Sequence, residues 1–407
     1  MKKVFSTIIM IAVLSFSLNS IAFASEIDIL LDKLVEKGVL SPVEATIIKD
    51  ETKQQVAAEI AQAKSALSPT WAQKVKINGD FRLRYQYQQK KASQTRNRGR
   101  VRYRLGITAD PVEKITLGAG LASGGGDPRS TNQTFQNTFE TPDIRLDYAY
   151  AEYKPFKEIS LISGIFQNKN YLWRPSDLLW DGDINPQGGA AHLHTSLMDA
   201  DVWINIGSLV LDESSSDESD PYMFYVQPGL NWANGPFDAK LAASFYSIDL
   251  RKHTLDYTSS TNTLDSDGKL LYKYDSISPA FEIGLAEPLG LPLERVALFG
   301  EFINAWDPEH NNKGWLVGFN FGNKKISKKG QWQGKYMYAE LQKDAWIDAF
   351  PDSDRYDGKT GVKSHEAILE YGLFDNVVLG FDYYNSRSLL ASKAPESIFQ
   401  ADINFKF

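Results

Sequence analysis

Cysteine is absent from the 407-residue chain, and histidine is scarce, with 5 residues. The absence of thiols excludes a disulfide framework and any thiolate metal or redox site. No G-x-S-x-G sequence, phosphate-binding loop or dinucleotide-binding glycine motif occurs either. A hydrolase that uses a serine, a histidine and a carboxylate therefore has no specific support in the sequence. We expect neither an enzymatic activity nor a cofactor.

A long apolar run is also missing after residue 24, which excludes a membrane-spanning helix there. Residues 1–24 have the pattern of a cleaved secretory signal, with Lys2 and Lys3, a short apolar stretch and then Ala22-Phe23-Ala24. A retained membrane anchor is the alternative, but Ser and Asn residues interrupt the apolar stretch. Any membrane crossing by the exported chain must then be made by strands.

Residues 25–70 differ in pattern from the rest of the chain and predict a periplasmic helical segment. Leucines repeat at helical spacing before Gly38, a residue that suits a left-handed helix end. Ser41 and Glu44 then fit a capping box for a second helix that begins at Pro42. Sparse apolar positions in this helix favour a coiled coil through which copies of the chain associate. A solvated helical linker is the alternative.

Apolar and polar residues alternate in many segments from Val75 onward, which is the period of a β-strand with two different faces. The count is about sixteen, and single-chain bacterial outer-membrane barrels have an even number of strands. The segments are 75–87, 100–108, 115–121, 144–153, 159–167, 190–198, 201–211, 222–232, 237–245, 272–286, 294–306, 315–321, 331–342, 362–372, 377–383 and 399–407.

The connections between these segments fall into two alternating sets. One set is short: Asp110-Pro111, Pro155-Phe156-Lys157, Asn234-Gly235-Pro236, Gly290-Leu291-Pro292 and Asp375-Asn376. The other set is long and polar: 122–142, 168–189, 212–221, 248–271, 343–361 and 387–396. Short turns at one rim and long loops at the other are typical of outer-membrane barrels.

The final segment, SIFQADINFKF at 397–407, has the clearest alternation in the chain. Every second residue from Phe399 to Phe407 is apolar, and the residues between them are polar. We expect this strand to pair with the strand at Val75, to place its apolar face against lipid, and to turn Asp402 toward Arg82 and Arg84. Its aromatic terminus resembles the ending that outer-membrane assembly machinery reads.

Together these patterns predict an all-β fold: a transmembrane antiparallel β-barrel of about 16 strands, preceded by a short α-helical periplasmic segment. The expected organisation is a signal peptide at 1–24, a helical or coiled-coil segment at 25–70 and an outer-membrane β-barrel at 71–407. A soluble β-sandwich or propeller also alternates. However, its outer faces are polar, and the sequence contains no blade repeat.

Five segments give the chain a resemblance to a known family. They are LLDKLVEKGVLSPVEA at 30–45, WAQKVKINGDFRLRYQY at 71–87, RGRVRYRLGI at 98–107, LASGGGDPRSTNQTF at 121–135 and LLWDGDINPQGG at 178–189. With these the chain resembles the bacterial putative porins, outer-membrane barrels with a short helical N-terminal segment. The resemblance covers most of the first half and implies a pore for small hydrophilic solutes. It supplies no substrate and no binding residues.

Six arginines occupy the polar faces of the first two strands: Arg82, Arg84, Arg98, Arg100, Arg102 and Arg104. A loop centred near Ser93 would place Arg84 opposite Arg100 and Arg82 opposite Arg102. An arginine that faces lipid costs about 2–4 kcal/mol near the midplane, so this face must line the pore. A basic pore wall lowers the barrier for anionic or dipolar solutes. The alternative is internal neutralisation by Asp80, Asp147 and Glu152.

The loop at 168–189 is the second candidate feature, because it contains Asp177, Asp181 and Asp183. If it folds inward as a constriction loop, its acids face the arginines and set up a field across the pore. An ordinary external loop is the alternative. The spacing of Asp181, Asp183 and Asn185 resembles the start of a calcium loop, but no glutamate completes it.

Two histidines, His192 and His194, should point to the same side of one strand. A zinc site there would need further ligands that the sequence does not supply, so no metal site is expected.

The function we expect is that of an outer-membrane porin of a Gram-negative type of cell, a passive channel for ion transport and small hydrophilic solutes with charge-based filtering. A substrate-specific channel is the first alternative, and an occluded barrel acting as an enzyme or adhesin is the second. Expected partners are outer-membrane lipid, the solutes, the assembly machinery through Phe407 and two further copies in a homotrimer. The net charge of −7 argues against nucleic acid.

Overall fold

The computed structural model describes residues 30–31, 33–67, 74–167, 169, 171–213, 215, 220–290, 292–390 and 394–407. The expected signal peptide, residues 1–24, lies outside these ranges. The chain forms two compact units, Met1–Lys74 and Val75–Phe407. Within the described ranges no helix combines the length and the apolar character needed to cross a membrane.

The first unit contains two helical stretches with the predicted ends. The stretch before Gly38 stops with that glycine at φ 70°, and the Val39 N–H bonds the Leu34 carbonyl at 3.0 Å. Helix α2 (Pro42–Leu67) begins with the predicted capping box. The Ser41 N–H donates to the Glu44 carboxylate at 2.9 Å, and the Glu44 N–H donates to Ser41 Oγ at 3.2 Å. Coiled-coil association through α2 stays a prediction.

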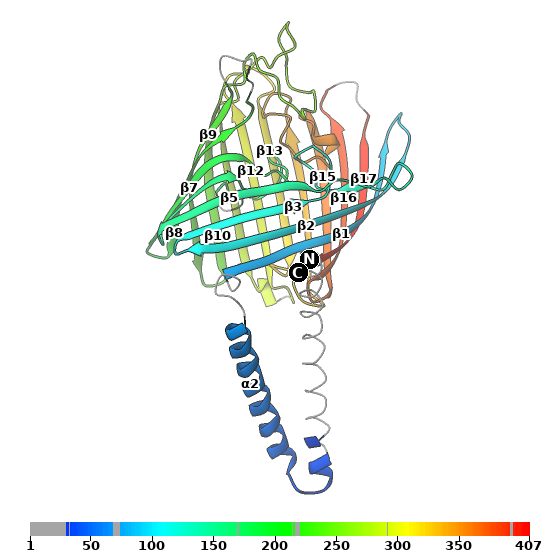
Figure 1. Cartoon of the computed structure of the whole chain (residues 1–407). Helices are drawn as coiled ribbons and strands as arrows, with labels where there is room; N and C mark the ends of the chain where they lie inside the picture. The colour runs from blue at the N-terminus through cyan, green and yellow to red at the C-terminus, as the bar shows by residue number, and fades with distance from the viewer. Residues whose placement is uncertain are drawn as a thin grey trace, which may run out of the picture. The chain divides into compact units, whose positions relative to one another are not determined.

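The second unit is a closed antiparallel barrel of sixteen strands, as predicted (Figure 1). Consecutive strands pair around the whole circuit, and the two-residue strand β4 adds only a short pairing to β2. The strands are β1 (Val75–Lys90), β2 (Arg96–Val112), β3 (Ile115–Ala122), β4 (Gln133–Thr134), β5 (Arg145–Phe156), β6 (Ile159–Ile165), β7 (Gln187–Leu197), β8 (Ala200–Val210), β9 (Tyr222–Asn234), β10 (Phe237–Ile248), β11 (Ser276–Ala286), β12 (Arg295–Ala305), β13 (Lys313–Gly322), β14 (Trp332–Leu341), β15 (Val362–Phe374), β16 (Val377–Ser388) and β17 (Glu396–Lys406).

One predicted turn, Asp110-Pro111, is wrong, and the predicted turn Pro155-Phe156-Lys157 is displaced, because Pro155 and Phe156 belong to β5. Strand β2 continues through Asp110-Pro111 to Val112, and the chain reverses at Lys114, which has φ 68°. Proline cannot donate a ladder hydrogen bond, but the pairing of β2 with β3 is irregular between Ala109 and Val112. That irregularity accommodates Pro111 inside the strand.

The barrel closes where β17 pairs with β1, as predicted. The ladder runs from Asp80 opposite Lys406 to Lys90 opposite Glu396. Beyond it, Gly79 and Phe407 exchange two backbone hydrogen bonds of 2.9 and 3.1 Å. The Phe407 ring lies over Gly79, where a Cβ atom would come within 2.6 Å of a ring carbon. Only glycine leaves room for the ring at this point.

The two faces of each strand differ as the alternation predicts. On β17 the Phe405 side chain is 37% exposed on the outer face, whereas Gln400 on the inner face is 1% exposed. Outward aromatic and aliphatic side chains continue around the barrel, for example Leu241 and Phe319. In a lipid bilayer, backbone groups paired around a closed sheet and an apolar outer face satisfy the two main physical requirements.

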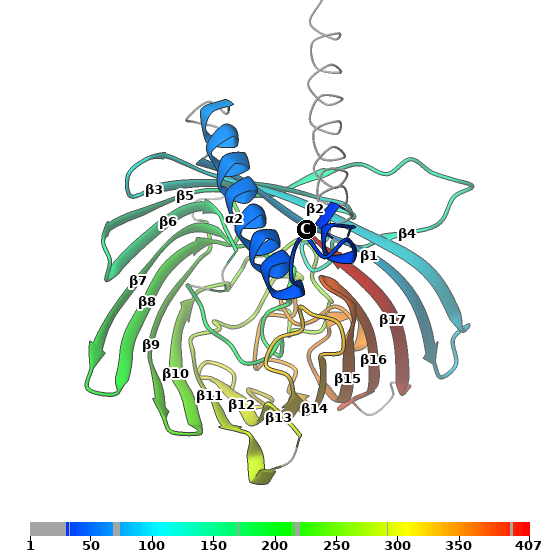
Figure 2. The same cartoon turned by 90° about the horizontal axis from the view of Figure 1, so that it is seen from below.

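The connections at the two ends of the barrel are unequal. Tight turns join β5 to β6, β9 to β10 and β15 to β16, whereas long segments join β3 to β5, β6 to β7, β10 to β11 and β14 to β15. Seen along the barrel, several of the long segments cross its interior (Figure 2). The inner face and these crossing segments therefore form the candidate site.

Candidate functional site

The six arginines on β1 and β2 form one inward surface, which we call the basic wall. They are Arg82, Arg84, Arg98, Arg100, Arg102 and Arg104. Arg82 is directly opposite Arg102, and Arg84 is opposite Arg100, so the predicted register is confirmed. The residues between them on β1, Leu83 and Tyr85, are exposed on the outer face.

Carboxylates bind most of the basic wall directly. Arg84 Nε and Nη2 donate to the two carboxylate oxygens of Asp402, both at 2.8 Å, and Nη1 donates to Asp354 at 3.0 Å. Asp80 accepts from Arg102 at 2.9 Å and from Arg104 at 2.7 Å. These pairs remove the like-charge repulsion that facing arginines would otherwise cause. The expectation that Asp402 would pair with Arg84 is confirmed.

Arg98 and Arg100 differ from the other four arginines. Among the described residues no carboxylate oxygen lies within 4.0 Å of either guanidinium. Arg98 donates to Gln88 at 2.9 Å, and Arg100 donates to Gln86 at 3.1 Å and to Ser130 at 3.3 Å. Neutral partners satisfy these hydrogen bonds, so neither arginine makes a direct ion pair, although Asp354 interacts with both charges at longer range.

The predicted constriction loop contacts the inner face of the barrel at several strands. Asp183 accepts from Arg104 at 3.3 Å and from the Thr131 N–H and hydroxyl, both at 3.0 Å. On the opposite side Trp173 exchanges hydrogen bonds with Gln227 of β9. Asp183 and Arg104 thus form a direct ion pair instead of facing each other across open space.

The segment between β14 and β15, residues 342–361, also lies inside the barrel. The sequence predicts only a long polar connection at 343–361. Its Trp346 is fully buried, and the indole N–H donates to the Leu179 carbonyl at 2.7 Å. Phe350 stacks on Trp180 with ring centroids 4.8 Å apart. We call this packed cluster, with Tyr246 of β10, the inner-loop core. Apolar residues at Trp346 and Phe350 in a loop were the sequence signal for it.

The same segment holds a buried charge cluster. Arg355 Nη2 donates to Asp177 at 2.9 Å and to Glu366 of β15 at 2.8 Å. Asp177, Asp352 and Glu366 present oxygens close enough together to hold a metal ion, and carboxylates suit a hard cation. Arg355 already supplies a positive charge to two of the three. Burial opposes ionisation of Asp177, but Arg355 outweighs it and lowers the pKa of that carboxyl.

Asp181 joins the two interior segments. Its carboxylate accepts the Asp183 N–H at 2.9 Å and the Ser353 N–H at 2.8 Å. Burial, followed by the neighbouring Asp183 carboxylate, raises the pKa of Asp181 to about 8, although both N–H donors favour its ionised form. A protonated Asp181 is therefore part of the packing at neutral pH.

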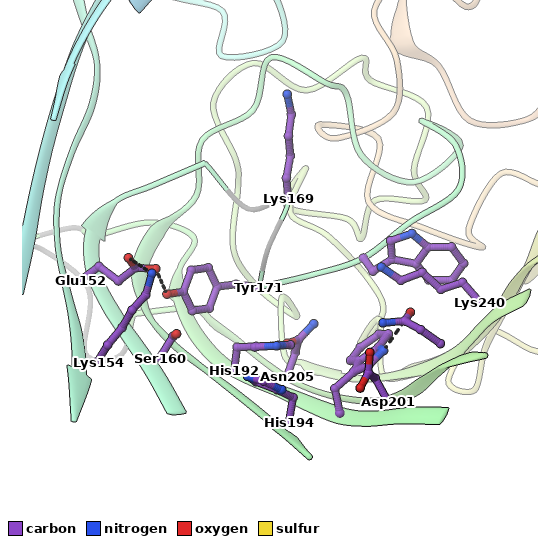
Figure 3. A pocket seen from close by; sticks show the side chains of 13 residues that line it. Glu152, Lys154, Ser160, Lys169, Tyr171, His192, His194, Asp201, Asn205 and Lys240 are labelled. Atoms are coloured by element: carbon purple, nitrogen blue, oxygen red, sulfur yellow. Dashed lines mark hydrogen bonds and ion pairs between the residues drawn. The ribbon is translucent and has the colours of Figure 1, made fainter. Parts of the chain in front are cut away.

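A cavity of about 350 Å³ lies along the inner face of β5 to β10 (Figure 3). His192 and His194 line it with stacked rings whose centroids are 5.4 Å apart, so they share one side as predicted. His192 Nδ1 is 2.7 Å from Asn205 Oδ1. Neither histidine belongs to a set of three potential metal ligands in the part of the chain that the structure describes.

Comparison with known families gives one match, and it covers most of the chain. The family model described as "Putative porin" matches residues 86–284 and 294–407. No curated protein matches the sequence.

Solved structures give the same fold. Pseudomonas putida OprB, in a high-pH structure, is similar with a TM-score of 0.54 at 12% identity, covering 83% of this chain and 95% of OprB. Salmonella typhi OmpF, in a complex with daunomycin, has a TM-score of 0.50 at 11% identity, covering 82% and 97%. At these identities the likeness concerns the barrel fold alone.

Proposed function

The chain belongs to the putative porin family and is an outer-membrane β-barrel channel, and we propose that it conducts ions and small hydrophilic solutes passively, with filtering by charge. The observation that carries this proposal is the polar inner face of β1, β2 and β17, which runs along the barrel beneath an apolar outer face. Asp80, Arg102, Arg104 and Asn404 of this face line a cavity of about 210 Å³, which gives solutes a polar surface along part of it. The proposal assigns no catalytic residue to the chain.

The interior segments make the pathway narrow. The inner-loop core fills the lumen beside β9, β10 and β14, and the ion pair between Asp183 and Arg104 ties the constriction loop to the opposite side. Solutes must therefore pass beside these segments, which supports selection for small size. The roles of Asp177, Asp181 and Asp183 are to hold the constriction loop in place.

The charge filter depends on the arginines that lack carboxylate partners. Arg98 and Arg100 keep a positive potential in the lumen, whereas the charges of Arg84, Arg102 and Arg104 are balanced. A positive pore wall concentrates anions and lowers their barrier. We therefore expect a moderate preference for anions over cations.

The expected setting is a homotrimer in a Gram-negative outer membrane. The short-turn end and the helical segment at 25–70 would face the periplasm, with the long loops outside. The exposed side chains of Val43 and Ile47 on α2 support association of copies through this helix. Phe407 would be the group that the assembly machinery reads.

Single-channel recording on the purified protein in planar lipid bilayers tests the proposal. We expect discrete conductance steps in potassium chloride and a reversal potential, under a salt gradient, on the anion-selective side. Swelling of liposomes that contain the protein should be fast for small neutral sugars and slow for large ones. An absence of conductance steps in correctly folded protein would overturn the channel, and cation selectivity would overturn the filter.

A further inference from the structure

Lys240 of β10 places its ammonium group between two aromatic rings, and its cross-strand neighbour on β11 is Glu282. Its Nζ lies 4.9 Å from the centroid of the Trp173 ring and 5.3 Å from that of Trp203. Among the described residues no carboxylate lies within 4.0 Å of Nζ. The electron-rich faces of the two indoles stabilise the ammonium at a site where it has little contact with water. They do not neutralise its charge. The lysine therefore keeps a charge available to a ligand.

The two rings are held in place by neighbouring groups. Trp203 lies flat over Gly229, where a Cβ atom would come within 2.2 Å of the ring, and its indole N–H donates to Asn231 at 3.3 Å. The backbone of Trp173 donates to Gln227 at 2.8 Å and accepts from it at 2.7 Å. Gln227 is itself almost fully buried. The Trp203 ring and the backbone of Trp173 are therefore held in place before any ligand arrives, which reduces the entropic cost of binding.

Open space lies next to Lys240 and the two indole rings. Lys240 and Trp173 line the cavity of about 350 Å³ and also a neighbouring one of about 640 Å³. These volumes match those of small-molecule sites. Several acids line the two cavities, and most have partners of their own. Glu152 pairs with Lys154 at 2.9 Å and accepts from the Tyr171 hydroxyl at 2.6 Å, and Arg295 pairs with both Asp238 and Glu282. A second positive group, Lys169, lines the same cavity.

We propose that this cavity is a binding site for a small organic monocarboxylate with a planar apolar body. The carboxylate pairs with Lys240, and the apolar body packs on Trp173. Asp201 and Glu152 on the same cavity wall repel a dianion such as phosphate more strongly than a monoanion. This inference rests on the proposed channel and gives that channel a preferred class of solute.

Benzoate is a suitable probe because it carries one carboxylate on a flat ring. In planar bilayers we expect benzoate to reduce the conductance of the channel in a saturable way, and the neutral isostere benzamide to have no such effect. Lys240→Gln should weaken the apparent affinity for benzoate at least tenfold, and Lys240→Arg should retain most of it. Trp173→Leu, which changes no charge, should weaken it several-fold.

The matched control is Lys335→Gln. Lys335 of β14 also faces the interior and lies 4.9 Å from an aromatic ring centroid, that of Phe299, but it does not line the cavity. Block by benzoate should be unchanged in this variant. Conductance without saturable block, equal block by benzamide or glucose, or equal loss in both lysine variants would overturn the site and leave the channel intact. A loss of all conductance in the unmodified protein would instead overturn the channel.

Discussion

The two sides of the lumen are built from different interactions. The inner-loop core beside β9, β10 and β14 consists of buried aromatic and aliphatic contacts around Trp346. The basic wall on β1 and β2 is held by ion pairs such as Arg84 with Asp402. Apolar packing is short-ranged and carries no charge, whereas ion pairs respond to pH and to substitution of either charge, even where they are largely buried as Arg84 and Asp402 are. One side therefore fixes the shape of the pathway, and the other sets its charge.

Removing the centre of the inner-loop core should have the largest effect. Trp346→Ala leaves a large cavity, for which we expect a loss of about 3–5 kcal/mol in packing free energy. The interior segments should then become accessible to protease, and the single-channel conductance should increase. Limited proteolysis and bilayer recording measure these changes. The control is Trp306→Ala, because that side chain is largely exposed. Unchanged protease resistance in Trp346→Ala would show that the core does not hold the segments.

A smaller effect should separate paired from unpaired arginines. Arg84→Gln removes the nearest cation of Asp402 and Asp354 and leaves Asp402 only the longer ion pair with Arg82 at 3.6 Å. Breaking a buried pair costs about 3 kcal/mol, and the change should loosen residues 342–361. Arg100→Gln removes a charge that has no carboxylate partner, so it should shift the reversal potential toward cations without changing protease resistance. If both variants loosen the segment equally, the distinction between paired and unpaired arginines fails.

The smallest effect should be a pH dependence in the constriction loop. The pKa of Asp181 is about 8 in the folded protein and near 4 when unfolded. The native state thus binds a proton that the unfolded state releases, so the loop loses stability as pH rises from about 4 to about 8. The ionised Asp181 repels Asp183 and Asp354. Protease cleavage of the loop should therefore increase as the pH is raised from about 4 to about 8 and change little above that.

Asp181→Asn resembles the protonated form and should remove this pH dependence, whereas Asp256→Asn, at an exposed position in another loop, should preserve it. If cleavage of the loop in Asp181→Asn still increased with pH as in the unmodified protein, the pH dependence would belong to another group.

The barrel and the basic wall could be predicted from the sequence because both depend on local periodicity. A period of two assigns each strand residue to a face, so the positions of Arg82 and Arg84 follow from Leu83 and Tyr85. The same rule placed Asp402 beside Arg84 once the first and last strands were paired. Pro111 was misread as a turn because an irregular pairing, which depends on the neighbouring strand, accommodates it.

The contacts between the two interior segments could not be predicted from periodicity. The bond between Trp346 and the Leu179 carbonyl joins residues from two different long connections, and no periodicity relates them. The pairing of Arg355 with Asp177 has the same character. Such contacts become visible only in three dimensions, although a tryptophan in a connection is a usable signal that the segment is packed.

The ion pair of Arg84 with Asp402 spans the closure between β1 and β17, where the two residues are direct partners. Sliding β17 by one position would turn Asp402 into lipid, and sliding it by two would set Arg84 against Gln400 or Asn404, neither of which carries a charge. Each of these shifted registers breaks the ion pair between Arg84 and Asp402. The ion pair therefore favours the correct register of β17 on β1, and a barrel closed in another register is less stable.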